Sequence, residues 1–395
     1  MTSEGQAAAE LRTRMAQATQ TSAQDWYLVG KARQGMQAIL CTVRKTTGRD
    51  EVATQLFTCV TAINPILAAG MRPVYVDIDP QTLSLDAGAL ELGNQTGAVV
   101  LQHSYGLIDR ASSVALREAA HAAGAILLED CAHCVGRIAR DESGEPVADV
   151  SVHSFGVEKI LAGTYFGGAV WINPSLSDAA LAQAIRTALD DLPAMDKRLD
   201  KATRSYLNQV RILTRLPQGA SKAMRARWER RGTFEPAVSE EERRGGTNHD
   251  PSKPTEWVCE QALGALASLD DNEAQRRACV NAYLSAFSSA PNELFVPAGV
   301  RAAADQPLLR FPVFMPDGER ATAAAQAVER QGYYVPAWPR PLLVPGVLDP
   351  VPYGIAQGTK DWPVSQELSE RSVALPTDVD PSVIPTIAQM VLDLL

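Results

Sequence analysis

Residues 97–136 read GAVVLQHSYGLIDRASSVALREAAHAAGAILLEDCAHCVG, and their alternation of apolar runs and amphipathic sequence indicates the fold. The first apolar run, at 97–106, is continuous, which is typical of a strand buried on both faces. Apolar residues then recur at helical spacing through 110–124, where a glycine closes the helix. A second apolar run follows at 125–136, so the stretch predicts a strand, a helix and another strand.

The sequence before this stretch continues the same alternation. GMQAILCTVRKTT (35–47) has helical spacing, ATQLFTCVTAINPILAAGM (53–71) predicts a strand that runs into a helix, and RPVYVDIDP (72–80) predicts a strand. Strands that alternate with helices indicate an α/β fold, in which a mostly parallel sheet is covered on both faces. Ligands of such sheets bind at the carboxyl ends of the strands.

The chain length predicts more than one domain, because single hydrophobic cores stop growing well below 395 residues. Hydrophobic residues make up 46% and charged residues 21%, which is ordinary for a globular protein with a full core. WVCEQALGALASLDDNEAQRRACVNAYLSAF (257–287) predicts one long amphipathic helix that leads into a second domain. There, LLRFPVFM (308–315), AAAQAVERQGYYV (323–335) and the end of the chain predict strand, helix, strand, helix.

The charge balance and the ends of the chain exclude some classes of protein. A formal net charge of −9 argues against a general nucleic-acid binder, which needs a dominant cationic face. The N-terminal segment lacks the apolar core of a signal peptide, and no run is long enough for a transmembrane segment, so we expect a cytoplasmic protein. The six cysteines are too few and too scattered for a disulfide framework and are expected to be reduced thiols.

The segment 196–253 differs from the rest of the chain in being polar and basic. Residues 201–231 hold nine lysines and arginines but one acid, Glu229. One interpretation is a solvated helical insertion or a subunit contact. The alternative is a surface for an anionic partner such as a nucleotide, a polyanionic substrate or a membrane surface.

Two ionisable residues stand where buried strands are predicted. Lys159, in SVHSFGVEKILAGTYFGGAV (151–170), lies between two apolar runs, where an amine must find a charge partner, lose its charge or be covalently occupied. Asp130 closes the strand LLED at the edge where ligands bind. A lysine that forms a Schiff base with pyridoxal phosphate (PLP), and an acid on the pyridine nitrogen, are the general arrangement for this cofactor. Each residue alone is also compatible with a structural role.

The order of several segments makes that interpretation more specific. ATQLFTCVTAINPILAAGMRPVYVDIDPQTLSLD, VVLQHSYG, LLEDCAHCVG, VHSFGVEKILAGTYFGGAV and the C-terminal WPVSQELSERSVALPTDVDPSVI (362–384) resemble, in this order, the DegT family of PLP-dependent sugar aminotransferases. The resemblance covers roughly 26–190 and 255–395. It implies the aspartate aminotransferase fold, with a three-layer large domain around a mainly parallel seven-stranded sheet and a smaller C-terminal α/β domain. We expect an N-terminal extension (1–25), a large domain (26–255) with the basic insertion at about 196–253, and a small domain (256–395).

The resemblance assigns roles to individual residues. Lys159 matches the Schiff-base lysine and Asp130 the partner of the pyridinium nitrogen. Ser154 matches a phosphate ligand, and His133 stands where the family has glutamine or histidine against the ring hydroxyl. The alternative for His133 is a structural histidine at a strand end, with its ring nitrogens satisfied by hydrogen bonds.

Other positions depart from the family pattern. Where the family has a Ser-Gly-Thr turn for the phosphate, LVGKARQGMQAIL places Ala32 and Arg33, and the guanidinium could compensate for the lost hydroxyl. An ordinary surface arginine is the alternative. Cys59 occupies the position of an aromatic ring that stacks on the cofactor, or is a plain buried cysteine. The family's cross-subunit asparagine and arginine are not visible in SKPTEW (252–257), and Asn248 or Lys253 is the candidate substitute.

Two further patterns carry little functional weight. CAHC (131–134) has the spacing of a metal or redox motif, but no second CxxC accompanies it, so no metal is expected. His103 in LQHSYG is interpreted as a satisfied histidine at a strand end. No GxGxxG or Walker-type loop follows a strand, which leaves hydride transfer and phosphoryl transfer without a signature.

The sequence therefore predicts an enzyme that transfers an amino group from an amino acid, by resemblance glutamate, to a keto sugar that is linked to a nucleotide. The family also implies a homodimer with the active site at the subunit interface. A PLP-dependent sugar dehydratase is a second possibility, but such relatives replace the lysine with histidine. A non-catalytic relative that binds a sugar nucleotide or scaffolds a complex is a third, favoured by the altered phosphate turn.

Overall fold

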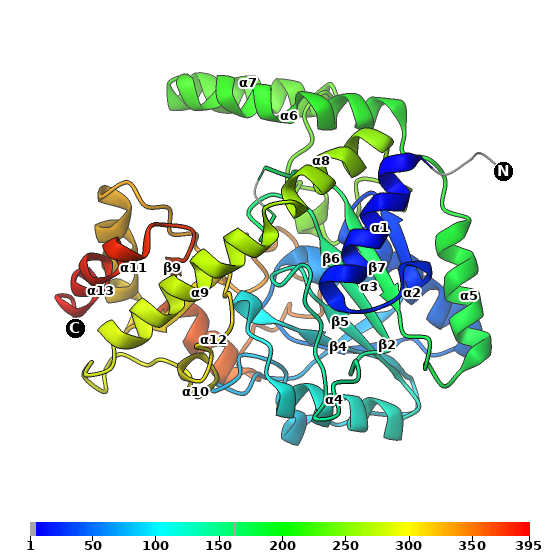
Figure 1. Ribbon diagram of the computed structural model, residues 1–395, viewed down its shortest axis with the longest axis horizontal. Coiled ribbons are helices and arrows are strands. Elements are labelled where there is room, and N and C mark those ends of the chain that lie inside the picture. Colours follow the sequence, from blue (N-terminus) through cyan, green and yellow to red (C-terminus); the bar gives the residue numbers. More distant parts are fainter. Residues whose placement is uncertain (1–4, 162) are drawn as a thin grey trace.

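The computed structural model describes residues 5–161 and 163–395, and its centre is a seven-stranded sheet (Figure 1). The strands are β1 (Trp26–Val29), β2 (Glu51–Thr54), β3 (Arg72–Tyr75), β4 (Thr96–Gln102), β5 (Ile126–Asp130), β6 (Val150–Ser154) and β7 (Gly168–Ile172). Their order is β1-β7-β6-β5-β4-β2-β3, and only β7 runs antiparallel to its neighbours β1 and β6. This confirms the predicted mainly parallel α/β sheet.

Helices cover both faces of the sheet, which makes the large domain three-layered. On one face, α2 (Ala32–Thr47), α3 (Val60–Ala68) and α5 (Ala179–Asp190) pack against the strands in one hydrophobic cluster. On the other face lie α1 (Gln6–Thr19), α4 (Arg110–Ala122) and α8 (Glu256–Leu266). All residues of β4, β5 and β7 are buried, as expected for strands with apolar side chains on both faces.

Local sequence signals set the ends of these helices. The side chain of Asp109 accepts a hydrogen bond from the amide of Ser112 and caps α4, and Gly124 follows the helix with a φ of +66°. Gly48 ends α2 in the left-handed conformation, with a φ of +74°. The helices predicted at 35–47 and 110–124 are therefore confirmed.

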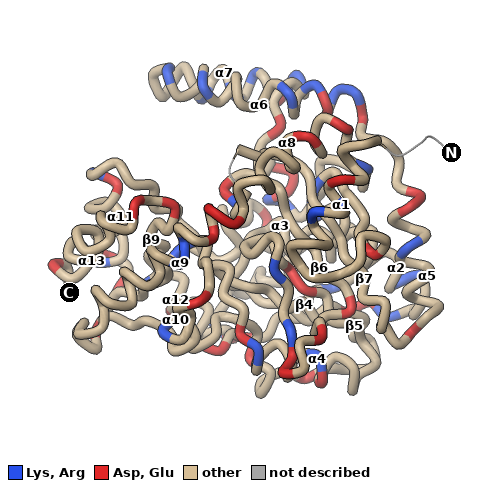
Figure 2. The backbone as a smooth tube through the Cα atoms, in the orientation of Figure 1, with Lys and Arg blue, Asp and Glu red and all other residues tan. Residues whose placement is uncertain are grey.

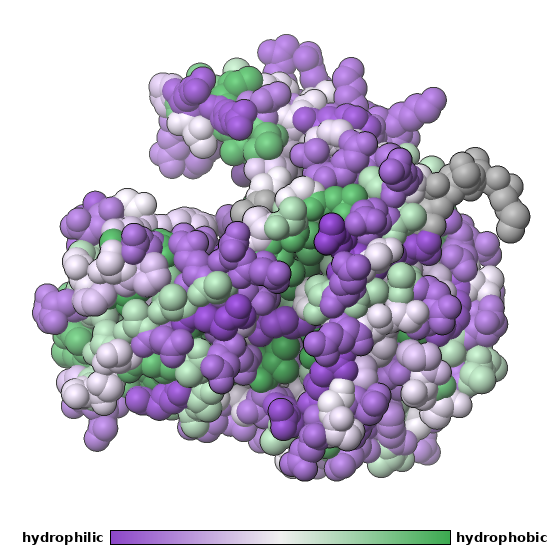
Figure 3. Space-filling model, in the orientation of Figure 1, coloured by the Kyte–Doolittle hydropathy of each residue, from purple (hydrophilic) through white to green (hydrophobic). Residues whose placement is uncertain are grey.

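The basic segment forms two helices, α6 (Lys197–Arg215) and α7 (Gln218–Arg230), which we call the arm. The arm projects from the body (Figure 1), and its lysines and arginines are spread along it (Figure 2). α6 buries one side, which includes Leu199 and Tyr206, in a cluster with Phe166 and Phe234. Figure 3 shows mainly hydrophilic side chains over the arm, with a smaller hydrophobic area on it.

The predicted single helix at 257–287 is wrong, because the structure divides it into α8 and α9 (Leu269–Ala286). Ser268 stands between them with φ −107° and ψ 13°, and its hydroxyl bonds the carbonyl of Ala265. Asp270 and Asp271 then occupy the first turn of α9, where acidic residues are favourable. The break sends α8 onto the sheet and α9 into the C-terminal core.

The C-terminal part has its own core around a two-stranded antiparallel sheet. Its elements after α9 are α10 (Ala298–Arg301), β8 (Arg310–Phe314), α11 (Gly318–Arg330), α12 (Pro363–Arg371), β9 (Ser372–Pro376) and α13 (Ile384–Leu392). The second strand is β9, so the predicted order of strand, helix, strand and helix is found with α12 added before β9, and residues 333–345 form no strand. Prolines at 336, 339, 341 and 345 lack the amide hydrogens that a strand there would need.

Short 3-10 turns complete the described elements: η1 (Ala23–Asp25), η2 (Ala87–Ala89), η3 (Ser104–Gly106), η4 (Glu242–Arg244) and η5 (Pro381–Val383). Within the described residues, no helix has the length and apolar character needed to cross a membrane. The exact domain limits at 25/26 and 255/256 stay predictions.

Candidate active site

A cavity of about 420 Å³ lies at the carboxyl ends of β4, β5 and β6. Parallel strands place their last residues at the same edge of a sheet, and Gln102, Asp130 and Ser154 end these three strands and line the cavity. The wall also includes the amino end of α2 and parts of the C-terminal core. All residues predicted for the site line this one cavity: Ala32, Arg33, Cys59, Asp130, His133, Ser154 and Lys159.

Asp130 presents a buried carboxylate, only 8% exposed. Its Oδ1 accepts a hydrogen bond of 2.9 Å from the amide of Ala132. Burial raises the pKa of Asp130, and this is opposed by that hydrogen bond and by the charge of Lys159. A cationic group bound in the cavity would therefore stabilise the ionised form of this buried carboxylate.

Lys159 lies in the connection between β6 and β7, and its charge interacts with the carboxylate of Asp130. Burial lowers the pKa of Lys159, and the nearby charges of Cys59, Asp130 and Glu158 oppose this. Among the described residues, no hydrogen-bond or ion-pair partner holds its Nζ. The preceding residue, Glu158, has a φ of +60°, which is strained for a residue other than glycine. A lowered pKa favours the neutral amine, which is the nucleophilic form.

His133 is held as a neutral imidazole. Its Nδ1 accepts a hydrogen bond of 3.2 Å from the amide of Tyr105, so the ring proton lies on Nε2. The ring also makes an edge contact with Trp338, with centroids 4.8 Å apart. Burial lowers the pKa of His133 well below its usual value, and the charges of Lys159 and Arg310 add to this. Trp338, from the C-terminal part, has no sequence pattern that would have assigned it to the site.

The amino end of α2 forms the opposite corner of the cavity. Lys31 is the N-cap residue, and Ala32 and Arg33 begin the helix. Amide groups at a helix N-terminus favour an anion. The hydroxyl of Ser154 accepts the amide hydrogen of Gly156 at 3.2 Å, which leaves its own proton available. We call this the α2 corner.

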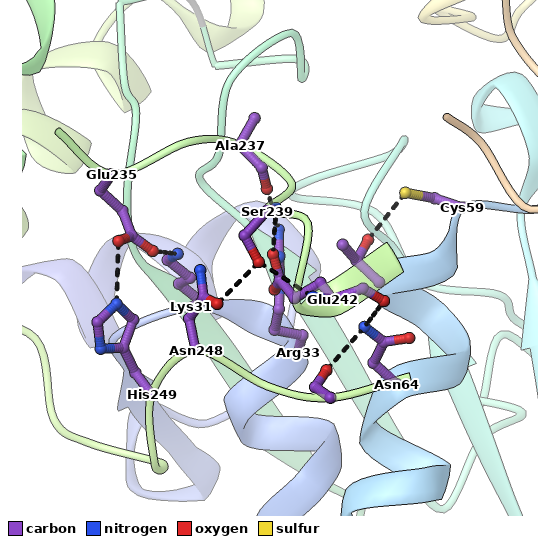
Figure 4. A network of polar contacts seen from close by, with 12 residues as sticks. Lys31, Arg33, Cys59, Asn64, Glu235, Ala237, Ser239, Glu242, Asn248 and His249 are labelled. Atoms are coloured by element: carbon purple, nitrogen blue, oxygen red, sulfur yellow. Dashed lines mark hydrogen bonds and ion pairs between the residues drawn. The ribbon is translucent and has the colours of Figure 1, made fainter. Parts of the chain in front are cut away.

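Two carboxylates from the segment 231–250 face the cations of the α2 corner (Figure 4). Lys31 pairs with Glu235, which also contacts His249 Nε2 at 2.9 Å, and Arg33 pairs with Glu242. Burial raises the pKa of Glu235, but the bonds and charges of His249 and Lys31 outweigh it and lower the pKa to about 2. Burial lowers the pKa of Lys31, and Arg33 adds to this. The cations of this corner are therefore already balanced by carboxylates.

The loop that carries Glu242 is fixed to the large domain. The amide of Asn64 donates to the carbonyl of Glu242 at 2.7 Å, and the hydroxyl of Tyr353 bonds Asn64 Oδ1 at 2.8 Å. The amide of Ser239 donates to Glu242 Oε2 at 2.9 Å. The sequence analysis missed Lys31, Glu235 and Glu242, because nothing in the sequence links α2 to a segment more than 200 positions later.

The remaining candidates have simpler surroundings. Cys59 lines the cavity, and its Sγ accepts the hydroxyl of Thr61 at 3.1 Å. Asn248 Oδ1 accepts the hydroxyl of Ser239 at 2.7 Å, and Lys253 Nζ bonds the carbonyl of Asp190 at 2.6 Å. Neither Asn248 nor Lys253 is among the cavity-lining residues.

The two cysteines of the CAHC motif lie in a buried polar cluster with His103, beside the cavity. Ligand atoms of His103, Cys131 and Cys134 lie within 4.8 Å of one another. Nε2 of His103 is 2.7 Å from Oε1 of Glu129, which fits the expected satisfied histidine at a strand end. Glu129 also accepts hydrogen bonds from the hydroxyl of Ser151 and the amide of Ala139, so this carboxylate connects β5 to β6 and, through His103, to the residue that follows β4.

These features define a class of protein, the PLP-dependent transferases with a lysine and a carboxylate beside a seven-stranded sheet. The DegT/DnrJ/EryC1/StrS aminotransferase family matches residues 5–210, and the chain belongs to this family. The family is PLP-dependent, and the two site residues that this cofactor requires share one cavity, so the residues present fit the group.

Individual relatives agree with this family. The chain is similar to a UDP-4-amino-4-deoxy-L-arabinose–oxoglutarate aminotransferase from Shewanella sediminis, with 27% identity over 42% of this chain and 41% of that protein. The chain therefore matches less than half the length of its curated relatives: 24% of a pleiotropic regulatory protein from Geobacillus stearothermophilus and 41% of the Shewanella aminotransferase. The aminotransferase TlmJ from Streptoalloteichus hindustanus has a TM-score of 0.67 at 23% identity, with 99% of this chain and 91% of that chain covered. NtdA from Bacillus subtilis, solved with bound cofactor PMP, has a TM-score of 0.69 at 14% identity, with 99% and 77% covered. These two structures share the fold.

Proposed function

We propose that the chain is a PLP-dependent aminotransferase that moves an amino group from an amino acid, glutamate, to a nucleotide-linked keto sugar. Family membership supports the reaction class. The observation that carries the proposal is that Lys159 and Asp130 line one cavity at the carboxyl edge of the sheet. The related aminotransferase from Shewanella sediminis supports a sugar nucleotide as the acceptor.

Bound PLP supplies an electrophilic carbonyl and a ring that withdraws electrons from a substrate carbon. Lys159 would hold it covalently through Nζ. In the half-reaction with the amino donor, the neutral Nζ would accept the proton from the donor's α-carbon and would deliver it to the cofactor carbon that receives the amino group. The lowered pKa of Lys159 suits this role, because it keeps Nζ able to accept a proton.

The other residues bind and orient. Asp130 holds a proton at the pyridine nitrogen, and the resulting charge pair offsets the burial that raises the pKa of its carboxyl group. Nε2 of His133 carries the proton that can be donated to the ring oxygen. The phosphate would be held at the α2 corner by the hydroxyl of Ser154, the amino end of α2 and the guanidinium of Arg33.

The test is the replacement Lys159→Ala. It should abolish turnover and remove the visible absorbance of the protein with PLP, because the other lysine of the cavity wall, Lys31, is paired with Glu235. Lys45→Ala, on the exposed side of α2, is the matched control and should behave like the parent chain. An unchanged spectrum in Lys159→Ala contradicts the assignment.

A non-catalytic relative is a second candidate, because the cations at the α2 corner are already paired with Glu235 and Glu242. Adding PLP and then L-glutamate distinguishes the two. A catalyst converts its absorbance to that of the pyridoxamine form, whereas a binding module leaves the spectrum of bound PLP unchanged.

We further infer a homodimer. The arm supports this inference, because it carries apolar side chains that this chain leaves partly uncovered. No residue of α7 is buried, Ile212 of α6 is 46% exposed, and both helices have half-buried apolar side chains. Sedimentation velocity at micromolar concentration should give a dimer. A monomer over the whole concentration range would contradict this proposal and leave the assignment of Lys159 intact.

A further inference from the structure

The buried polar cluster beside the cavity contains three side chains that the proposed reaction does not use. His103 follows β4, and Cys131 and Cys134 follow β5. One ligand atom from each of the three lies within 4.8 Å of the others, and both cysteines are free thiols. Imidazole and thiolate are the donors that zinc prefers in proteins. The cluster is therefore a candidate metal centre.

The local backbone brings the two sulfurs of this cluster together. The amide of Cys134 donates to the carbonyl of Cys131 at 3.0 Å, which closes a turn over residues 131–134. The two thiols also hydrogen-bond to each other. Zinc sites use pairs of cysteines at this spacing. The sequence contains the spacing once, which is why the spacing alone does not predict a metal.

The sheet supplies a third ligand that the spacing cannot show. β4 and β5 are neighbouring parallel strands, and their last residues, Gln102 and Asp130, are paired. His103 and Cys131 follow directly, so they lie side by side at the same edge of the sheet. The amide of His103 also donates to the carbonyl of Asp130, at 3.3 Å. Parallel pairing thus places an imidazole from one strand end next to two thiols from the adjacent strand end.

Glu129 holds the imidazole of His103 in one orientation. Its Oε1 is 2.7 Å from Nε2 of His103, and both side chains are almost fully buried. An ionised carboxylate only accepts hydrogen bonds, so Nε2 carries the proton of this bond and Nδ1 is the nitrogen left for a metal ion. Histidines that bind a metal usually donate the N–H of the other ring nitrogen to a carboxylate, a carbonyl or water. Glu129 therefore occupies the position of an outer partner of a zinc ligand.

The cluster is shielded on one side and open to the cavity on the other. Cys131 and Cys134 are fully buried in a hydrophobic cluster with Trp26 and Phe155. An apolar shell of this kind keeps water away from bonds between metal and thiolate. His103 lines the cavity, so a metal ion can reach the three ligands from the cofactor side before the cofactor binds.

We propose that His103, Cys131 and Cys134 bind one zinc ion. Both cysteines bind as thiolates and release their protons, so their two negative charges balance the charge of Zn²⁺. A water molecule from the cavity takes the fourth position. The zinc ion connects the end of β4 to the turn 131–134, which carries His133 and directly follows Asp130. Its role is structural, and the site does not depend on the aminotransferase function proposed above.

The ligand set favours zinc over other common ions. Mg²⁺ and Ca²⁺ bind oxygen ligands, whereas two of the three donors here are sulfur. Iron–sulfur clusters are held by four protein ligands, one more than this cluster offers.

The first experiment measures the zinc content of the full-length protein, produced with added zinc sulfate and dialysed under reducing conditions. The parent chain should retain one zinc ion per chain, and Cys134→Ser should retain none. Cys279→Ser changes a buried cysteine of the C-terminal core and is the matched control, so it should retain zinc like the parent chain. Competition with a chromophoric chelator gives the affinity, which Glu129→Gln should lower about 30-fold, the size of a lost outer partner. Thermal unfolding midpoints establish that each variant is folded.

Cobalt tests the ligands in the parent chain itself, so that no variant needs to fold. Co²⁺ in a tetrahedral site with thiolates gives intense visible bands and charge-transfer absorbance from sulfur to metal. Both should appear when Co²⁺ is added to the reduced, metal-free protein, and both should disappear when Zn²⁺ is added. The proposal is overturned if the parent chain holds no zinc, if Cys134→Ser holds as much zinc as the parent chain, or if the cobalt spectrum lacks the thiolate bands. None of these measurements involves Lys159, so the aminotransferase function is tested separately.

Discussion

The two ends of the cavity are built in different ways. At the ring end, Asp130, His133 and Lys159 come from one stretch of chain, between the end of β5 and the β6–β7 connection. At the α2 corner, Lys31 and Arg33 face Glu235 and Glu242, which are 204 and 209 positions away in the sequence. From sequence, Asp130, His133 and Lys159 are predicted to take the family's roles, whereas Ala32 and Arg33 at the α2 corner depart from the family pattern, as does Cys59.

The charges differ as well. At the ring end, burial shifts the pKa values of Asp130 and Lys159 toward their neutral forms, and Lys159 has no bonded partner among the described residues. At the α2 corner, every cation has a carboxylate against it. The ring end is thus open to a ligand, while a phosphate at the α2 corner must share its cations with carboxylates of the same chain. Three experiments test this difference.

The largest effect is expected at the ring end, from Asp130→Asn. An amide cannot hold the proton of the pyridine nitrogen by charge, so kcat should fall about 10³-fold, within the range of residues that hold or transfer a proton. PLP should still bind through Lys159. The measurement is steady-state turnover with glutamate and a nucleotide-linked keto sugar as acceptor, with Asp141→Asn, beside the exposed turn 142–145, as the control. A loss below tenfold would show that the carboxylate is not the partner of the ring.

The ring end and the sheet could be predicted from sequence because their signals are local. Continuous apolar runs and capped helices give the strands and helices, Asp130 ends β5, and Lys159 follows β6 within a short segment of recognisable sequence. The α2 corner could not be completed, because its carboxylates come from a segment whose composition suggested only a basic insertion. Arg310 lines the cavity but was missed for a related reason, since its position depends on how β8 lies against the sheet. The single helix expected at 257–287 failed at Ser268, where periodicity continues across a local change of direction.

A smaller effect is expected at the α2 corner, from Arg33. If its guanidinium holds the phosphate, Arg33→Ala should weaken PLP binding about 30-fold, the size of a lost charge-assisted hydrogen bond. The double variant Arg33→Ala with Glu242→Gln should be equally weak. Glu242→Gln alone should bind PLP a few times more tightly, because the guanidinium is freed from its carboxylate.

Titration of the apoprotein with PLP, followed by absorbance, gives these affinities. Glu240→Gln, an exposed acid of the same segment, is the control. If the double variant regains the parent affinity, Arg33 serves only to neutralise Glu242, and the phosphate is held by Ser154 and the helix end without it.

The smallest effect is expected from Glu235, whose contacts with His249 and Lys31 should make stability depend on pH. The folded pKa of about 2 lies below the usual value of 4.5, so the contribution is present above pH 4.5 and is lost as the pH falls toward 2. Burial lowers the pKa of Lys31, which opposes the pair, so its net contribution at pH 7 is about 1 kcal/mol rather than the full shift of Glu235. Glu235→Gln should therefore unfold more easily than the parent chain at pH 7 and equally easily near pH 2. Urea unfolding at pH 7, 5 and 3 measures the difference in unfolding free energy between the variant and the parent chain. If that difference does not shrink as the pH falls, Glu235 and Lys31 contribute through packing. The charges of the α2 corner would then not be what distinguishes it from the ring end.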